Sequence, residues 1–445
     1  MTSILANKPT GASSFFGVNV PSYDFLVNCM HCGLCLPQCP TYALTGLEKS
    51  SPRGRIRLIK AVADGDLPMT QGFIDEMNFC LDCQACETAC PAGVKYGALV
   101  ESARAQILQQ GYEQRFSALA KKFFFRWVFS RHNRIRLLAS LLKFYQKFGF
   151  QWFFQKSGLL KLVSRRLHDI QGLAPAISEK SSTEVYSEIV SSRGETKYRI
   201  GFLSGCIMDV AYADVNIDTV ELLRNHRCEV IIPKAQVCCG SLQAHHGDME
   251  VARRLAQTNI EAFSRFDLDA IVINSAGCGA FMKEYVHLLK DVPVLATKAR
   301  ELSSKVKDIT EFLTELGYHR ESYHAKADDI RGKRVTYHDA CHLVHTQKIS
   351  KQPRDLIRSV QGIEYVELPE STWCCGSAGI YNITHYDDSM KLLERKLQNI
   401  RTVKPDIIVT GNPGCLAQIQ YGLAKEGMKV ELMHTATFLR RASET

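Results

Sequence analysis

Short runs of β-branched and aliphatic residues alternate with amphipathic helical segments from residue 198 onward. Such alternation is typical of α/β domains whose sheets are mainly parallel. The clearest strand candidates are RIGFL at 199–203, AIVIN at 270–274, RVTYH at 334–338 and DIIVT at 406–410. The clearest helical segments are MEVARRLAQTNIEAF at 249–263 and MKLLERKLQNIRTV at 390–403.

The earlier part of the chain has a different pattern. Residues 1–22 form a polar arm, residues 23–112 show helical patterning around two cysteine-rich stretches, and residues 116–170 are basic, aromatic and helical. Residues 171–197 are polar and rich in serine, which is typical of a linker. A chain of 445 residues is too long for one compact core. We expect a multidomain α+β protein with a mainly helical first domain and duplicated α/β domains, bounded at residues 1–115, 116–197, 198–325 and 326–445.

An internal repeat divides the α/β part into two halves. The cysteines of the first half recur in the second: Cys206, Cys238, Cys239 and Cys278 correspond to Cys341, Cys374, Cys375 and Cys415. The offsets are 135, 136 and 137 residues, and Gly-Ser follows each adjacent pair (CCGS). Chance explains such near-equal offsets poorly, so we infer a duplication. We refer to these two sets of four cysteines as the first and the second CCG site.

The cysteine content distinguishes this chain from ordinary globular proteins. Hydrophobic and charged residues make up 45% and 23% of the chain, which is ordinary, but 17 residues are cysteine. The opening MTSILANKPTGASS has no basic region followed by an apolar stretch, so no secretory signal is visible. Many cysteines without a secretory signal favour metal ligation in a reducing compartment over a disulfide scaffold. We therefore expect a cytoplasmic protein.

The formal charge of +9 is concentrated in one patch. Residues 115–168, the basic aromatic segment, contain 13 Lys and Arg, 13 aromatic residues and no Asp or Glu, whereas the remainder has 42 basic against 46 acidic residues. No uncharged apolar run in it approaches the ~18 residues that span a bilayer. One helical face of the segment is apolar and carries Leu137, Leu138, Leu141, Leu142 and Tyr145.

Two interpretations of the basic aromatic segment stay open. An interfacial helix on anionic lipid fits its composition and would place the protein peripherally on the cytoplasmic face of a membrane, through residues 116–168. A helical hairpin packed on a partner protein or on the CCG domains fits equally well. Nucleic acid is not an expected partner, because no recognised binding motif accompanies the charge.

Two runs near the amino terminus have the spacing of a two-cluster ferredoxin. CMHCGLCLPQCP spans 29–40 and CLDCQACETACP spans 80–91, and each reads C-x2-C-x2-C-x3-C-P. Three thiolates of one run can bind one [4Fe–4S] cubane, while the fourth, next to Pro, reaches the other cubane. We assign cluster one to Cys29, Cys32, Cys35 and Cys90. Cluster two is assigned to Cys80, Cys83, Cys86 and Cys39.

Zinc is the alternative metal for these runs, because C-x2-C pairs often bind it, but two runs of four cysteines exceed the usual zinc spacing. Between the runs lies SPRGRIRLIKAVADG at 51–65, which places three arginines near clusters that carry negative charge. Two interpretations of Arg53, Arg55 and Arg57 are equally compatible with the sequence. The three arginines could form a solvated helix face, or they could tune the reduction potential of the clusters or dock a partner.

The CCG cysteines that stand alone all follow strand candidates. Ligands gather at the carboxyl ends of strands in open α/β sheets, so each half can bring its four thiols together. Four thiolates can hold a [4Fe–4S] cluster or a zinc ion, and thiols without metal are the third alternative. Nearby histidines are further candidates, namely His245, His246, His338, His342 and His345. Each could replace a thiolate or bond to a cluster sulfur. Core histidines whose hydrogen bonds are satisfied are commoner, however. Cys228 has no counterpart in the second half and is expected to be an inert strand residue.

Motifs for a flavin or a nicotinamide are missing from the sequence. It has no G-x-G-x-x-G after a strand, no P-loop and no G-x-S-x-G. We therefore expect no catalytic residue on this chain, and we expect substrate oxidation to take place on another chain.

The CCG pattern resembles the cysteine-rich domain of the heterodisulfide reductase family. In that family the pattern ends in C-x-x-C, whereas this chain has Phe281 and Gln418 at the last position. A fifth thiolate is therefore missing from both CCG sites. The absence argues against the non-cubane clusters and the disulfide-reducing chemistry that this resemblance would imply.

A closer resemblance covers nearly the whole chain. Two ferredoxin runs followed by two CCG domains are similar to the iron–sulfur subunit of glycolate oxidase, and the stretches that carry the likeness are SPRGRIRLIK at 51–60, CLDCQACETACPAGVKY at 80–96, SAGCGAFMKEY at 275–285, CCGSAGIYNITH at 374–385 and PDIIVTGNPGC at 405–415. The resemblance implies a partner FAD-containing subunit that oxidises glycolate or another 2-hydroxy acid such as D-lactate. Electrons would then pass through the clusters towards quinone or another acceptor. The departure from the family pattern is the basic aromatic segment, which is longer here.

Two rival functions stay open at this point. The first is a catalytic CCG enzyme that reduces disulfides at a cluster, and the missing C-x-x-C cysteine is the feature that discriminates against it. The second is the iron–sulfur, membrane-anchoring subunit of anaerobic glycerol-3-phosphate dehydrogenase. An assay of the native complex with each substrate separates that rival from the 2-hydroxy-acid oxidase.

Overall fold

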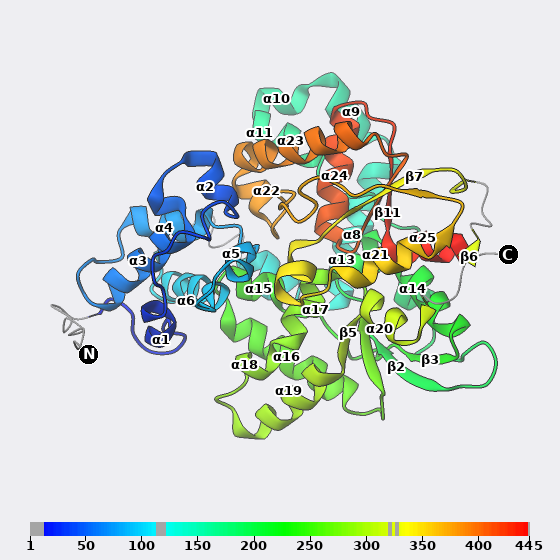
Figure 1. Cartoon of the computed structure of the whole chain (residues 1–445), viewed down its shortest axis with the longest axis horizontal. Helices are drawn as coiled ribbons and strands as arrows, with labels where there is room; N and C mark the ends of the chain where they lie inside the picture. Colours follow the sequence, from blue (N-terminus) through cyan, green and yellow to red (C-terminus); the bar gives the residue numbers. More distant parts are fainter. Residues whose placement is uncertain (1–12, 113–121, 319–322, 325–328, 444–445) are drawn as a thin grey trace. The chain divides into compact units, whose positions relative to one another are not determined.

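The computed structural model describes residues 13–112, 122–318, 323–324 and 329–443 (Figure 1). The chain divides into two compact units. The N-terminal unit consists of residues 1–120 and the short segment 242–250, and the C-terminal unit consists of residues 121–241 and 251–445. The basic aromatic segment and both α/β halves therefore belong to one unit.

The described part of the N-terminal unit is helical, as the pattern predicts. Its helices are α1 (Tyr23–Val27), α2 (Pro40–Thr45), η1 (Glu48–Ser50), α3 (Pro52–Ala63), α4 (Gln71–Phe79), α5 (Ala85–Thr88), α6 (Tyr96–Gln109) and most of α15 (Ser241–His245). The apolar faces of α3, α4 and α6 meet in one core, which includes Ile59, Val62, Phe73, Met77, Leu99 and Val100. The two cysteine runs lie in the short connections and helix ends around this core.

Helix α3, which lies between the two runs, begins at a well-defined cap. The Ser51 hydroxyl accepts a hydrogen bond from the Gly54 N–H at 3.0 Å, and Pro52 occupies the first turn, where its missing N–H costs nothing. Gly54 is required by close packing, because a Cβ there would lie 1.9 Å from the Glu48 carbonyl oxygen. The cap and this close contact fix α3 against η1, next to the cysteine loops.

The two α/β halves contain the same sheet. The first half has the strand order β1-β3-β2-β4-β5, and the second has β9-β7-β10-β11. The bounds are β1 Ile189–Val190, β2 Tyr198–Phe202, β3 Cys228–Ile231, β4 Ala270–Ile273, β5 Val306–Asp308, β7 Arg334–His338, β9 Glu364–Tyr365, β10 Ile407–Thr410 and β11 Glu431–His434. Neighbouring strands are parallel except β1 and β3. Without β1 the two orders correspond strand for strand, which confirms the predicted duplication and the mainly parallel sheets.

Helices cover both sheets. The short strands β6 (Tyr323–His324) and β8 (Val360–Gln361) form a small additional parallel pair. The helices of the two halves are α13 (Ile207–Ala211), α14 (Ala213–Asn225), α16 (Met249–Phe263), α17 (Ala276–Lys283), α18 (Tyr285–Leu288), α19 (Pro293–Lys305), α20 (Ile309–Glu315), η4 (His342–Thr346), α21 (Lys351–Arg358), α22 (Tyr381–Thr384), α23 (Tyr386–Val403), α24 (Pro413–Lys425) and α25 (Thr435–Ser443). Helix α14 of the first half packs against α25 of the second. One continuous apolar core results, with Leu222 and Val230 from the first half and Tyr337, Ile407 and Phe438 from the second.

The segment before the first half is folded onto it. The basic aromatic segment forms η2 (Lys122–Val128), α8 (His132–Lys147), α9 (Phe150–Ser157), α10 (Leu159–Val163) and α11 (Arg165–Gln171), which the helical pattern predicts.

The serine-rich stretch at 171–197 is not the free linker that its composition predicts, because it contains α12 (Ser182–Val185) and the edge strand β1. Its serines have structural partners: the Ser182 hydroxyl donates to the buried Asp209 carboxylate at 2.7 Å. Burial raises the pKa of Asp209, but hydrogen bonds from His132 and Ser182 lower it below its ordinary value. Polar composition here reflects the need to satisfy a buried carboxylate, which composition alone does not reveal.

Candidate metal centres

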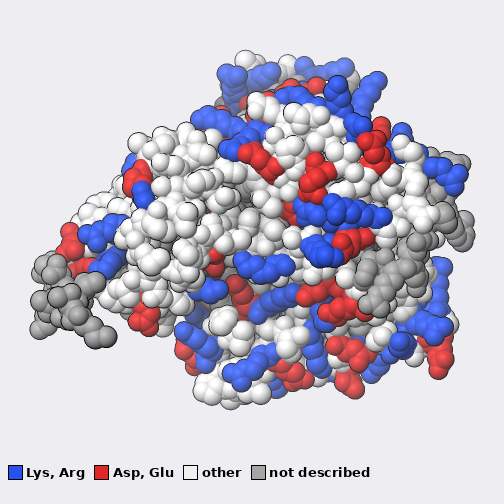
Figure 2. All heavy atoms as spheres, in the orientation of Figure 1, with Lys and Arg blue, Asp and Glu red and all other residues white. Residues whose placement is uncertain are grey.

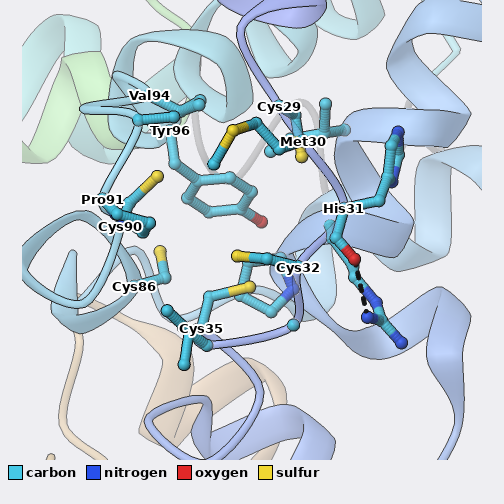
Figure 3. A pocket seen from close by; sticks show the side chains of 16 residues that line it. Cys29, Met30, His31, Cys32, Cys35, Cys86, Cys90, Pro91, Val94 and Tyr96 are labelled. Carbon is cyan, nitrogen blue, oxygen red and sulfur yellow. Dashed lines mark hydrogen bonds between the residues drawn. The ribbon is translucent and has the colours of Figure 1, made fainter.

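Five cysteines line one cavity of the N-terminal unit (Figure 3), namely Cys29, Cys32, Cys35, Cys86 and Cys90. The loop of the first run turns sharply between its cysteines, because His31 and Gly33 have positive φ angles of 55° and 87°. Arg53 Nη1 donates to the His31 carbonyl at 3.0 Å and holds this loop against α3. Figure 3 shows the sulfur atoms of Cys32, Cys35, Cys86 and Cys90 turned towards the same space, beside the Tyr96 ring.

A second group of thiols adjoins the first at Cys86. Burial raises the pKa of Cys86, and the neighbouring Cys83, Cys80 and Cys39 raise it further, so these four sulfur atoms are close enough to interact. Cys80 Sγ accepts hydrogen bonds from the Asp82 N–H at 3.3 Å and from the Tyr96 hydroxyl at 3.4 Å. Such donors stabilise a thiolate and its cluster, and they tune the potential of the cluster.

The last cysteine of each run lies near thiols of the other run. Cys90 of the second run lines the cavity with Cys29, Cys32 and Cys35 of the first, and Cys39 of the first run interacts with Cys86 of the second run and with Cys35 of its own run. The structure thus gathers cysteines of both predicted sets but does not divide them into those sets, because Cys86 lines the cavity of the first set and Cys39 lies near both Cys35 and Cys86. Which thiolate binds which iron stays a prediction.

The three arginines of α3 have different environments. Arg57 is exposed, as a solvated face would require, whereas the Arg55 side chain is fully buried. Arg55 donates to the Thr41 hydroxyl at 3.0 Å and to the Glu76 carbonyl at 2.8 Å, and lies 3.5 Å from the Glu76 carboxylate. Burial lowers the pKa of Arg55, but Tyr96, Cys80, Cys39 and Glu76 raise it above its ordinary value. A permanent cation is therefore built into the interior next to the second thiol group.

His245 at the end of α15 belongs to a network of charged groups in the N-terminal unit. Its Nδ1 lies 2.8 Å from a Glu101 carboxylate oxygen and 3.1 Å from one of Asp82, and Arg104 donates to its carbonyl at 2.9 Å. Burial lowers the pKa of His245, but the two carboxylates raise it to about 10. His245 is therefore satisfied by two carboxylates. His246 is likewise satisfied, because its Nδ1 pairs with the Leu242 carbonyl at 2.7 Å.

The four thiols of the first CCG site come together at the carboxyl ends of the central strands of the first sheet. Cys206 lies four residues after β2, Cys278 is in the first turn of α17 after β4, and the adjacent pair lies in the loop before α15. Hydrogen bonds from Cys206 and Cys239 lower the pKa of Cys238 well below its ordinary value, although burial opposes them. The hydrogen bonds with Cys238 and Cys278 raise the pKa of Cys239 in turn. The arrangement stabilises a thiolate at Cys238.

The second CCG site repeats this arrangement at the ends of β7 and β10. The Cys375 and Cys415 sulfurs lie 3.6 Å apart, and a hydrogen bond between Cys341 and Cys374 is the largest influence that raises the pKa of Cys341. The Gly376 N–H donates to Cys374 Sγ at 3.5 Å, and Asn412 Nδ2 donates to Cys415 Sγ at 3.8 Å. Backbone and amide donors therefore accompany the thiols, as they do around bound iron–sulfur clusters.

The donor sets of both CCG sites fit a soft metal. All 17 cysteines lie within the described residues and none forms a disulfide, so each site offers four sulfur donors, the set that iron–sulfur clusters and zinc prefer. Neither site has a fifth thiol: Phe281 is buried, and Gln418 is bonded to Ser389 and Asn382. Cys228 pairs in register with Tyr198 at the amino ends of the strands, away from both sites, and burial raises its pKa to about 12.

A buried lysine is the main feature that the sequence did not reveal. Lys396 of α23 is fully buried and donates to the Ser371 carbonyl at 3.2 Å and to the Glu370 carbonyl, in the loop that leads to the second adjacent pair. The corresponding residue of the first half is Asn259, which donates to the Cys238 carbonyl at 3.1 Å. Burial lowers the pKa of Lys396 to about 8, although the thiols of Cys375 and Cys374 raise it. Its position on the apolar stripe of α23 is the signal that could have identified it.

One face of the basic aromatic segment makes polar contacts with the CCG halves, and the other face is exposed. Towards the CCG halves, Arg136 reaches Asp209 at 3.4 Å and Gln146 donates to the Pro175 carbonyl at 3.0 Å. On the other face Leu141 is 62% exposed and Leu162 of α10 is 85% exposed. Figure 2 shows Lys and Arg side chains gathered over α10, at the top of the view. Within the described residues, no helix combines the length and hydropathy that crossing a bilayer requires.

Family models match four parts of the chain. A 4Fe-4S dicluster domain matches residues 26–94, and a cysteine-rich domain matches twice, at 200–283 and 335–420. The linker region of the glycolate oxidase iron-sulfur subunit matches residues 117–174. This last match corrects the expectation that the basic aromatic segment departs from the family, because the segment is one of its features. Residue composition identified the segment as unusual among proteins but could not show that relatives share it.

Two of the curated relatives match nearly the whole chain. A probable glycolate oxidase iron-sulfur subunit of Bacillus subtilis (strain 168) is 40% identical over 421 residues, and the glycolate oxidase iron-sulfur subunit of Escherichia coli (strain K12) is 30% identical over 424 residues. Each alignment covers 94% of this chain and 94% of the relative. Lactate utilization protein A of Oceanobacillus iheyensis is 32% identical over 252 residues, which are 55% of this chain and 98% of that protein. The chain therefore belongs to the family of glycolate oxidase iron–sulfur subunits.

Proposed function

We propose that this chain carries electrons from the reduced flavin of a partner subunit, which oxidises glycolate or D-lactate, towards quinone or another acceptor. As a member of its family, the chain is the electron-transfer subunit of a 2-hydroxy-acid oxidase complex. The observation that carries the proposal is the gathering of cysteines from both runs in the N-terminal unit. Two [4Fe–4S] clusters bound there would supply one-electron chemistry, which a two-electron flavin donor needs.

The protein environment supports this role for the two thiol groups. The buried Arg55 cation offsets the negative charge that cysteine thiolates bring to a cluster. The N–H of Asp82 and the hydroxyl of Tyr96 donate to Cys80 and would raise the potential of the second cluster. These residues hold the thiols and set how readily electrons are accepted.

Electrons can enter or leave at the edge of the first thiol group. Cys32 is the exposed member of the eight cysteines, and its neighbours Met30 and Leu34 are 66% and 57% exposed. An exposed ligand with an apolar rim suits a redox partner that docks there and excludes water from the contact. We assign the flavoprotein contact to this edge.

The two CCG sites are suited to act in succession. The loop that leads to Cys278 bonds directly to the loop that leads to Cys415: the Ala276 N–H donates to the Gly411 carbonyl at 3.1 Å, and the Gly277 N–H donates to Asn412 Oδ1 at 3.3 Å. Metals bound at both sites would therefore be linked by a few hydrogen-bonded residues. We propose [4Fe–4S] or zinc at each site, with iron at both sites extending the relay.

The test of the relay is the Cys86→Ser variant of the complex. Because Cys86 belongs to the second thiol group and touches no substrate, flavin reduction by glycolate or D-lactate should stay within about twofold of wild type. Reduction of a quinone acceptor should fall by more than about tenfold, with loss of one EPR signal. Cys228→Ser is the matched control, because this thiol is buried on β3 away from every site, and it should leave both rates unchanged. Loss of flavin reduction in Cys86→Ser, or activity of the wild-type complex with glycerol 3-phosphate alone, would refute the proposal.

We also propose that the basic aromatic segment holds the complex on an anionic membrane surface. Its exposed leucines and aromatic residues lie next to Lys and Arg side chains that no Asp or Glu of the segment neutralises. Apolar insertion and attraction to anionic headgroups then act together, each cation adding about 1 kcal/mol near the surface. The location on the cytoplasmic face of the membrane, close to a quinone pool, follows from this proposal.

Vesicle sedimentation tests the membrane contact. The full chain should bind vesicles that contain phosphatidylglycerol, bind pure phosphatidylcholine weakly, and dissociate as salt is raised. Leu141→Glu combined with Leu162→Glu should weaken binding by roughly tenfold or more, since burying each leucine contributes about 1.5–3 kcal/mol. Val294→Glu on α19 is the control, because Val294 is 79% exposed but lies outside the segment. Equal binding by all three proteins would exclude the segment as the lipid contact.

A further inference from the structure

The two CCG sites differ at one position next to the thiols. Three residues before the first cysteine of each site, the first half has Leu203 and the second half has His338. Both positions lie at the carboxyl end of the equivalent strand, β2 or β7, and both side chains are 1% exposed. The duplicated fold therefore places an imidazole in the second site where the first has only an apolar side chain.

His338 has no ordinary structural role that the described residues reveal. The backbone of Ser371 lies beside the ring, but neither ring nitrogen meets hydrogen-bond geometry with any described residue. The buried His434, in contrast, is bonded through both nitrogens, to the Asn274 carbonyl at 2.8 Å and from the Ala436 N–H at 3.1 Å. A buried polar group without partners is unfavourable unless something absent from the polypeptide satisfies it.

The ring of His338 is directed at two cysteines of the site. A ring nitrogen of His338 and the sulfurs of Cys375 and Cys415 all lie within 4.8 Å of one another, and all three residues are buried. The two sulfurs are 3.6 Å apart, close to the ~3.8 Å expected for two thiolates bound to one tetrahedral ion. One nitrogen and two sulfurs form a donor set for iron or zinc.

We propose that His338 is a nitrogen ligand to the metal that Cys375 and Cys415 hold, which makes the second CCG site a mixed nitrogen–sulfur centre. The inference rests on the proposed function in one respect, namely that the second CCG site binds metal. The fifth donor of this site is then an imidazole, at a position where the first site has Leu203. A neutral nitrogen adds no negative charge to the centre, and together with buried Lys396 it makes the centre easier to reduce than an all-thiolate one. Electrons that arrive at the CCG sites would thus collect at the second.

The experiment compares the full chain with three variants, purified anaerobically with its partner. His338→Leu copies the first half, His338→Cys replaces the nitrogen by sulfur, and His345→Leu is the control. His345 is buried on η4 but interacts with the backbone of Thr372. Iron, zinc and sulfide are counted for each protein. Histidine labelled with ¹⁵N then reports a directly bonded nitrogen, by pulsed EPR if the metal is iron, and X-ray absorption at the zinc edge reports it if the metal is zinc.

The expected result is a bonded nitrogen in the wild type and in His345→Leu that disappears in both His338 variants. His338→Cys should keep its metal, and His338→Leu should lose part of it. A nitrogen signal that persists in His338→Leu, or a wild-type centre with sulfur ligands only, would overturn the inference and leave the proposed function intact. Metal content that is unchanged in a fourth variant, Cys375→Ser combined with Cys415→Ser, would show that the site binds no metal. That result would overturn this inference together with the proposed metal at the second CCG site, but not the relay through the N-terminal unit.

Discussion

At the scale of single residues, a buried cation distinguishes Arg55 from the other arginines of its helix. The three alternate along α3, but only Arg55 faces the interior, where it bonds to Thr41, Ser50 and Glu76. The Glu76 carboxylate also accepts from the Ser50 hydroxyl and lies 3.2 Å from Lys49. Arg55 is thus the centre of a charged network between the two cysteine runs.

Replacing Arg55 by methionine should destabilise the N-terminal unit by about 3 kcal/mol, because Glu76 would lose its closest buried cation. Arg57→Met, an exposed change on the same helix, should alter the free energy of unfolding by no more than about 0.5 kcal/mol. Anaerobic urea denaturation, followed by cluster absorbance and by circular dichroism, measures both. Adding Glu76→Gln to Arg55→Met should restore part of the loss, and equal effects of the two single changes would contradict the buried-network account.

The sequence predicts which thiols lie together better than it predicts the residues that surround them. The cysteine spacings predicted which thiols the fold gathers in the N-terminal unit and in each CCG half, because a cluster requires particular residue types at particular separations. Arg55 and Lys396 escaped prediction as buried cations, since whether a charged residue of an amphipathic helix is buried depends on what packs against that helix. Lys396 shares its face with the buried Leu392, Leu393 and Ile400, which is a usable but weak signal.

At the scale of secondary-structure elements, α15 brings a titrating group to the N-terminal unit. The pKa of His245 is about 10 in the folded protein, against about 6.5 in the unfolded chain. The folded state therefore keeps a proton that the unfolded chain releases. The stabilisation is complete below about pH 6.5 and is lost as the pH rises through about 10.

Stability of the wild-type chain should consequently fall between pH 7 and pH 10. His245→Gln should be less stable at pH 7 and should lose less over this range, whereas His246→Gln, the neighbouring control, should follow the wild type. Anaerobic chemical denaturation at a series of pH values measures the slopes. A wild-type slope that matches that of His245→Gln would show that the Asp82–Glu101 pair does not hold the proton.

Element boundaries were predictable where apolar periodicity runs to the end of an element. Strand β7 and helix α16 begin and end at the predicted residues. Helix α23 begins at Tyr386, four residues before the predicted start, because its first turn contains Asp387 and Asp388. Acidic residues in the first turn favour the helix through its dipole. They do not extend the apolar periodicity, so this periodicity does not reveal where the helix begins.

At the scale of the whole molecule, the repeat was predictable but its packing was not. Two copies of one sheet follow from the cysteine offsets and the alternating pattern. That α14 and α25 pack together into a single core does not follow, because an apolar helix face looks the same in sequence whichever half covers it. Contacts between the halves include Thr437 and Arg440, which bond to Asp218 at 2.6 Å and 3.1 Å.

The assignment of residues 242–250 to the N-terminal unit has a consequence for biogenesis. This segment supplies His245 to Asp82 and Glu101, and Gly247 packs so closely on Arg104 that a Cβ would lie 2.5 Å from its backbone. A nascent chain that has left the ribosome only as far as the serine-rich stretch therefore lacks a part of its first unit. Iron loading of the amino-terminal cysteines would meet an incomplete scaffold until more than half of the polypeptide has been synthesised.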